Sequence, residues 1–234
     1  MTTYKRIGIL GGLSPESTIT YYEYITRTYR DRFGDHGYPE ILIYSLSFQE
    51  FMDWMKEGRW DLITDKIVEG ISRLHKGGAD FGLIATNTMH AVFDEVEKRS
   101  PMPLISIIDA TADEVKKEHI KVVGLLGTEF TMSGDFYKKK LMSYSVQTLV
   151  PEKEDRKYIN RVIFEELVNG QVLQRSRKNL IRIVEKLKKR GAQGVILGCT
   201  ELPLLIREED VDIKLFNTTI IHAERALIYA ISGK

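Results

Sequence analysis

Short apolar runs bounded by glycine recur along the whole chain, and the stretches between them carry apolar residues at helical spacing. This pattern is typical of parallel sheets covered by helices, so it predicts an α/β fold. Strands are predicted at residues 6–10, 41–46, 81–85, 104–107, 122–126, 146–150, 194–197 and 213–216. Helices are predicted after Ser14, where a capping residue precedes proline, and at residues 60–75, 88–98, 133–142, 155–168, 177–189 and 220–231.

An internal repeat divides the chain into two similar halves. The segment IGILG at residues 7–11 is matched by VGLLG at residues 123–127. A Gly-Ala pair, a strand and then Thr86 in the first half are matched by a Gly-Ala pair, a strand and then Cys199 in the second. Such a repeat predicts two pseudo-symmetric α/β lobes. Because ligands bind beyond the carboxyl ends of parallel strands, we expect the active site in a cleft between the lobes.

Cys199 is the single cysteine of the chain, so it can form no internal disulfide and no cysteine-based metal site. It follows the predicted strand at residues 194–197, where Thr200-Glu201-Leu202 could begin a short helix. Helix N–H groups favour a thiolate, so we expect this position to lower the pKa of the thiol. Cys199 is therefore the candidate catalytic base, and the alternative is a buried, inert cysteine.

Thr86 occupies the equivalent place in the first half. Removal of an α-proton on one face of a substrate and delivery of a proton to the other requires an acid/base group on each side. A threonine hydroxyl is a very weak acid and a poor base, so Thr86 would need help from His90 or from a water molecule. The alternative role for Thr86 is that of a hydrogen-bonding cap.

Further polar side chains at these strand ends could bind a substrate carboxylate through amides, hydroxyls and main-chain N–H groups. The carboxylate of Glu201 could also orient a substrate ammonium group or relay a proton to the thiol. For each position the alternative is a helix cap without a ligand. These residues are Asn87, Thr88, Thr128, Ser133, Thr200 and Glu201.

Composition excludes several other classes of function. The formal net charge of +1 gives no field that would attract nucleic acid or an anionic membrane. The apolar runs are too short to span a bilayer, and the N-terminus lacks the pattern of a signal peptide, so we expect a cytoplasmic protein. The glycines at residues 8–12 do not fit the dinucleotide-binding spacing, and the histidines are scattered. We therefore expect a small-molecule substrate, no cofactor and no metal.

Three motifs resemble the aspartate/glutamate racemase superfamily, and they are most similar to its aspartate racemase branch. They are IGILGG with SPEST at residues 7–18, ATNTMH at residues 85–90 and GCTELPLL at residues 198–205. The resemblance implies two Rossmann-like lobes, each a mainly parallel four-stranded sheet flanked by helices, and a homodimer. The order of elements places the lobe boundary near residues 116–119, and the resemblance implies that the segment from residue 213 packs back on the first lobe. Residues 1–116 and 213–234 are then expected to form the first lobe and residues 117–212 the second.

The resemblance also implies racemisation without pyridoxal phosphate by two cysteines that face each other across the cleft. Cys199 matches the cysteine that takes the α-proton of the L-enantiomer, and Thr86 stands where the other cysteine is found in the family. The function expected from this pair is racemisation of an acidic amino acid, aspartate or glutamate. The alternatives are a single-cysteine decarboxylase of the same superfamily and a weak or inactive homologue that binds an amino acid.

Substrate contacts are implied by the same resemblance. Asn87 and Thr88 match residues that hold the α-carboxylate, and Thr128 and Thr200 match such residues more loosely. The arginine that binds the side-chain carboxylate in many aspartate racemases is not evident after the second strand. Gln49 is the candidate to replace it.

Overall fold

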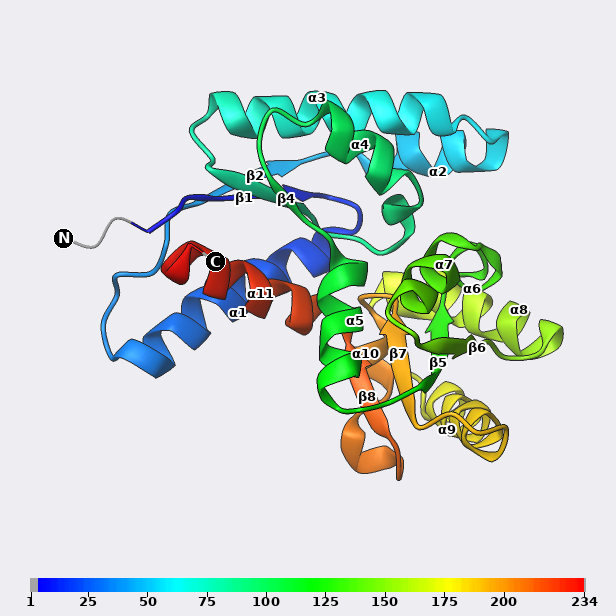
Figure 1. The fold of residues 1–234 in the computed structure, drawn as a ribbon. Coiled ribbons are helices and arrows are strands. Elements are labelled where there is room, and N and C mark those ends of the chain that lie inside the picture. The colour runs from blue at the N-terminus through cyan, green and yellow to red at the C-terminus, as the bar shows by residue number, and fades with distance from the viewer. Residues whose placement is uncertain (1–3, 234) are drawn as a thin grey trace. The chain divides into compact units, whose positions relative to one another are not determined.

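The structure is a computed structural model that describes residues 4–233, and the chain forms two compact units (Figure 1). The first unit contains the described residues up to Ile107 and those from Thr219 onward, and the second contains Ile108–Thr218. Each unit is built on its own four-stranded sheet, and every strand pair is parallel. The predicted α/β class with two similar halves is confirmed.

The sheet of the first unit has the order β2-β1-β3-β4. Its strands are β1 (Ile7–Gly11), β2 (Ile41–Ser45), β3 (Phe81–Ile84) and β4 (Leu104–Ile105). The sheet of the second unit repeats this arrangement as β6-β5-β7-β8. Its strands are β5 (Val122–Gly127), β6 (Gln147–Leu149), β7 (Gly194–Gly198) and β8 (Lys214–Asn217). All eight predicted strands are present, and the sequence repeat corresponds to a repeat of strand order.

Helices cover both faces of the first sheet (Figure 1). Ile7 and Ile9 of β1 pack against one set of helices and Leu10 against the other, because alternate residues of a strand point to opposite faces. The first set contains α1 (Pro15–Phe33) and α11 (Thr218–Ser232). The second set contains α2 (Phe48–Glu57), α3 (Trp60–Lys76), the 3₁₀-helix η1 (Thr88–Val92) and α4 (Phe93–Arg99).

The helices of the second unit enclose a core around Leu126, Val195 and Leu197 of the central strands. A π-helical turn, η2, interrupts the region that the sequence predicts as one helix over residues 155–168. The elements are α5 (Ile107–Lys117), α6 (Glu129–Ser133), α7 (Phe136–Ser143), α8 (Lys153–Arg161), η2 (Val162–Glu166), η3 (Leu167–Asn169), α9 (Gln174–Lys189), α10 (Leu202–Leu205) and η4 (Glu208–Asp210). None of the helices within residues 4–233 is both long and apolar enough to cross a membrane.

The expected lobe boundaries are wrong in two places. Strand β8 pairs with β7 through partners such as Val195 and Leu215, so the segment from residue 213 does not return to the first lobe as a whole. Only α11 does so, by packing small residues against β1 and β3. Helix α5, apart from Ile107, belongs to the second unit rather than to the first lobe. Its residue Asp109 accepts a hydrogen bond from the Tyr144 hydroxyl at 2.9 Å.

Candidate active site

The candidate residues of the central strands lie directly after the carboxyl ends of those strands. In the first unit, Thr86 and Asn87 follow β3, and in the second unit Cys199 and Thr200 follow β7. Thr128 follows β5. Because ligands of open parallel sheets bind beyond these ends, each unit carries one cluster of polar side chains in the expected place.

The second-unit cluster is centred on a thiol and a carboxylate. Cys199 is 7% exposed and Glu201 is 4% exposed, so both groups are largely removed from water. The Cys199 thiol donates a hydrogen bond to Oε2 of Glu201 at 2.9 Å. The Thr200 hydroxyl donates to the same oxygen at 2.8 Å. The carboxylate is therefore held against the thiol in a position to accept its proton.

The pKa of the Cys199 thiol is raised well above its ordinary value. Burial is the largest cause, and the negative charge of Glu201 and its hydrogen bond to the thiol add to it. Main-chain N–H groups of Glu201 and Leu202 lower the pKa, but by less. The main-chain N–H groups thus act in the expected direction, but the expectation of a lowered thiol pKa is wrong for the free protein, in which the thiol is protonated at neutral pH.

The first-unit cluster is centred on Thr86, a buried residue. Its main-chain N–H donates to the Ile84 carbonyl at 2.8 Å, and its carbonyl lies 2.8 Å from Nδ1 of His90. Among the described residues, the Thr86 hydroxyl makes no hydrogen bond. The alternative of a capping role is therefore not supported, and the hydroxyl is available to a ligand.

His90 does not help Thr86 in the way the sequence suggests. Its Nε2 accepts a hydrogen bond from the Ile107 N–H at 3.1 Å, so in the neutral ring Nδ1 carries the proton and donates to the Thr86 carbonyl. Both ring nitrogens are thus occupied by main-chain groups rather than by the Thr86 hydroxyl. Burial and the neighbouring His222 lower the pKa of His90 to about 3, so the ring is neutral at physiological pH.

The remaining first-unit candidates lie near the strand ends. Asn87 is buried and precedes η1, and its side chain makes no capping hydrogen bond to that helix. Thr88 is the first residue of η1 and is partly exposed. Gln49 lies in the first turn of α2, which follows β2, and its exposed side chain donates to Asp53 at 3.0 Å. Gln49 is therefore close in sequence to a strand end but is engaged within its own helix.

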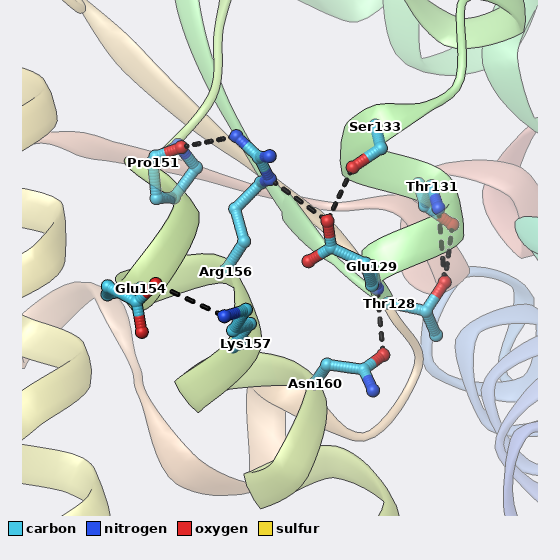
Figure 2. A network of polar contacts seen from close by, with 9 residues as sticks. All are labelled: Thr128, Glu129, Thr131, Ser133, Pro151, Glu154, Arg156, Lys157 and Asn160. Atoms are coloured by element: carbon cyan, nitrogen blue, oxygen red, sulfur yellow. Dashed lines mark hydrogen bonds and ion pairs between the residues drawn. The ribbon is translucent and has the colours of Figure 1, made fainter.

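Thr128 is the N-cap of α6, where its side chain accepts from the Thr131 N–H at 3.2 Å and lies 3.0 Å from the Thr131 hydroxyl (Figure 2). The helix also uses Ser133, whose hydroxyl donates to Glu129 at 2.6 Å. For these two positions the capping or helix-internal role is thus realised. The hydroxyls of Thr128 and Ser133 thus have protein partners and need no ligand to satisfy them.

A polar network holds the chain after β5 in place, and sequence reasoning missed it (Figure 2). Arg156 of α8 donates to Glu129 at 3.2 Å and to the Pro151 carbonyl at 3.1 Å. The Glu129 N–H donates to the Asn160 side chain at 2.8 Å. Because these partners are about thirty residues apart in sequence, no local pattern marks them. Within the described part of the chain, no group of three or more His, Cys, Asp and Glu side chains could hold a metal ion.

Comparison with known proteins places this chain in a racemase family. The family model described as Asp/Glu/Hydantoin racemase matches residues 10–226. A structure from Yersinia pestis, described as a candidate Asp/Glu racemase, is 37% identical with a TM-score of 0.91, and the match covers 97% of this chain and 100% of that one. The match confirms the resemblance to this superfamily.

Two further relatives cover nearly the whole chain. An aspartate racemase homologue from Pyrococcus horikoshii OT3 is 39% identical with a TM-score of 0.83, covering 97% of this chain and 99% of that one. The broad specificity amino-acid racemase RacX of Bacillus subtilis (strain 168) is 24% identical over 216 residues, which are 91% of this chain and 92% of RacX. The similarity therefore extends over both units.

Proposed function

Because the chain belongs to the Asp/Glu/Hydantoin racemase family, we propose that it racemises an acidic amino acid, aspartate or glutamate, without a cofactor. Cys199 acts on the L-form and Thr86 serves the opposite face of the substrate. The observation that carries this proposal is the buried hydrogen bond between the Cys199 thiol and the Glu201 carboxylate. Such a pair supplies both a group that can attack an α-proton and a group that can first accept the proton of the thiol.

Glu201 takes the proton of Cys199, and the thiolate then removes the α-proton of the L-amino acid, which leaves a carbanion and a neutral thiol. A substrate ammonium group near Glu201 would offset the negative charge that helps to raise the pKa of Cys199. The thiol would therefore ionise when substrate is bound and remain protected from side reactions in the free protein.

The opposite face is served by a weaker acid. In our proposal the Thr86 hydroxyl, directly or through a water molecule, delivers a proton to the carbanion to give the D-form. Thr86 then regains a proton from solvent, and Glu201 releases to solvent the proton that it took from Cys199. The free hydroxyl supports this role, since its hydrogen-bonding capacity is not used by the described protein groups. An aliphatic hydroxyl is a far weaker acid than a thiol, so the two faces should react at unequal rates. Exchange of the L-form with retention should therefore be faster than inversion.

Substrate recognition would use the polar groups around these two residues. Asn87 and Thr88 would bind the α-carboxylate, assisted by Thr128 and Thr200, which match the family's residues more loosely. Gln49 would face the side-chain carboxylate. Similarity to the Pyrococcus horikoshii homologue favours aspartate, and similarity to RacX favours tolerance of other side chains. The proposal also includes a homodimer that works in the cytoplasm.

The test is proton NMR of L-aspartate and L-glutamate in deuterated water, combined with chiral analysis of the products. Loss of the α-proton signal with appearance of the D-form is the expected result. Exchange with complete retention would assign activity to Cys199 and remove Thr86 from the proposal. If the acids stabilise the protein without any exchange, the protein binds amino acids and the proposal is wrong. Release of carbon dioxide from a disubstituted malonate would indicate a decarboxylase instead.

A further inference from the structure

Two buried histidines of the first unit lie beside the Thr86 strand end, and the proposed reaction uses neither. His90 and His222 are both buried, and their ring centroids are 6.1 Å apart. Buried histidines without a charge partner are costly unless their ring nitrogens are satisfied. The partners of those nitrogens therefore show what the rings hold in place.

Both rings bond to the same short segment, residues 105–107, which follows β4 and leads into α5. His90 accepts from the Ile107 N–H at 3.1 Å, and His222 Nε2 lies 2.8 Å from the Ile105 carbonyl. Because a carbonyl only accepts, Nε2 of His222 carries its proton, and Nδ1 accepts from the Tyr21 hydroxyl at 2.7 Å. The two histidines are thus opposite tautomers, Nδ1–H in His90 and Nε2–H in His222.

Only His90 also bonds to the main chain beside the catalytic candidate. Its Nδ1–H donates to the Thr86 carbonyl at 2.8 Å. The ring stacks on Phe93 with centroids 4.9 Å apart and an angle of 5° between planes. It meets the His222 ring edge-on at 78°. These contacts fix the plane of the imidazole, so the Thr86 carbonyl and the Ile107 N–H are held by one rigid group.

We propose that His90 is a positioning residue, which sets the orientation of Thr86 by joining its carbonyl to the start of α5. This inference rests on the proposed function, because it assigns Thr86 a role in proton transfer. Ile107 is the last residue of the first unit before the chain enters the second. His90 therefore ties the strand end that carries Thr86 to the segment where the chain passes between units. The His90 ring does not touch the reacting atoms.

Three substitutions separate the two hydrogen bonds of His90. In His90→Asn the side-chain nitrogen can take the place of Nδ1 and keep the bond to the Thr86 carbonyl. In His90→Gln the side-chain oxygen can take the place of Nε2 and keep the bond to Ile107. His90→Phe removes both bonds and keeps an aromatic ring to stack on Phe93. His222→Phe is the matched control, since it removes an equally buried ring that does not bond to Thr86.

The experiment measures α-deuterium exchange from the L- and D-forms separately for each variant. We expect His90→Phe to slow exchange of the D-form about 10- to 100-fold, the range typical of a misplaced group, with a much smaller effect on the L-form. His90→Asn should restore most of the D-form rate, and His90→Gln should not. His222→Phe should lower stability without changing the ratio of the two rates. Equal losses on both forms in His90→Phe, or rescue by His90→Gln alone, would overturn the inference.

Long-range proton–nitrogen NMR of the histidine rings tests the same inference without turnover. The wild-type protein should show the Nδ1–H tautomer for His90 and the Nε2–H tautomer for His222. An Nε2–H tautomer for His90 would overturn the inference, because the bond to the Thr86 carbonyl would then be lost. If the wild-type protein exchanges neither amino acid, the proposed function fails by itself. The tautomer and the Thr86 amide signals in His90→Asn and His90→Phe then decide whether His90 holds this turn.

Discussion

The two buried histidines predict that the first unit loses stability as the pH falls from 7.5 to 5.0. The pKa of His90 is lowered to about 3 and that of His222 to about 4, in both cases chiefly by burial. A histidine in an unfolded chain has a pKa of about 6.5. Between these values the unfolded chain binds protons that the folded protein does not, so the free energy of unfolding decreases as the pH falls below about 6.5.

The size of the effect follows from the pKa differences. Each histidine contributes about 1.4 kcal/mol per pH unit once the pH is well below 6.5. Lowering the pH from 7.5 to 5.0 should therefore cost about 2 kcal/mol for each histidine and about 4 kcal/mol for both. The pKa values of Asp61 and Asp80 are lowered, to about 2 for Asp61, so these carboxylates contribute below this window. The loss is a large share of the roughly 5–15 kcal/mol that stabilises a typical domain.

Urea unfolding followed by tryptophan fluorescence measures this loss. Both tryptophans, Trp54 and Trp60, lie in the first unit, so their emission reports on the part of the molecule that holds the histidines. In His90→Phe the pH dependence should fall to about half, since one of the two titrating groups is gone. His75→Gln, at an exposed histidine, is the control. A free energy of unfolding that stays constant between pH 7.5 and pH 5.0 would refute the reasoning.

Three further predictions concern the site. Glu201→Gln removes a negative charge beside the thiol, so the pKa of Cys199 should fall and its reaction with iodoacetamide should begin at lower pH. Exchange of the α-proton should slow about tenfold or more, because the group that accepts the thiol proton is gone. An unchanged pH profile of the iodoacetamide reaction would contradict the causes given for the raised pKa. Thr86→Cys places a thiol on the second face and should raise D-form exchange about 100-fold, as measured by NMR, whereas no gain would argue against Thr86 facing the substrate. Thr128→Ala removes a helix cap and should lower the free energy of unfolding, measured with urea, by about 1 kcal/mol. It should slow α-proton exchange less than Thr200→Ala does.

Much of the fold could be predicted from the sequence because the strands are short apolar runs, and the central ones, such as β1, β5 and β7, carry glycine at their ends. The apolar pattern of a strand does not, however, indicate which other strand it pairs with. The run at residues 213–216 predicts β8 correctly, but its pairing with β7 is set by hydrogen bonds between distant segments. Helices α2 and α5 were missed as elements, and α5 is held in the second unit by contacts such as that of Asp109 with Tyr144.

The positions of the candidate residues at the strand ends could be predicted from the sequence, but their electrostatics could not. The positions of Thr86 and Cys199 after equivalent strands follow from the repeat, which the structure reproduces in its strand order. The raised pKa of Cys199 depends on burial and on the Glu201 side chain turning back toward the thiol, and neither can be read from local sequence. The role of His90 depends in the same way on the Ile107 N–H, which is 17 residues away.

The central claim is that Cys199 transfers the α-proton of an L-amino acid. The most direct measurement compares wild-type protein and Cys199→Ser in the exchange of the α-proton of L-aspartate in deuterated water, with circular dichroism to show that both are folded. We predict exchange in the wild type and a loss of about 100-fold or more in Cys199→Ser, because a serine hydroxyl is a far weaker acid than a thiol. Exchange that continues at the wild-type rate in folded Cys199→Ser would contradict the account.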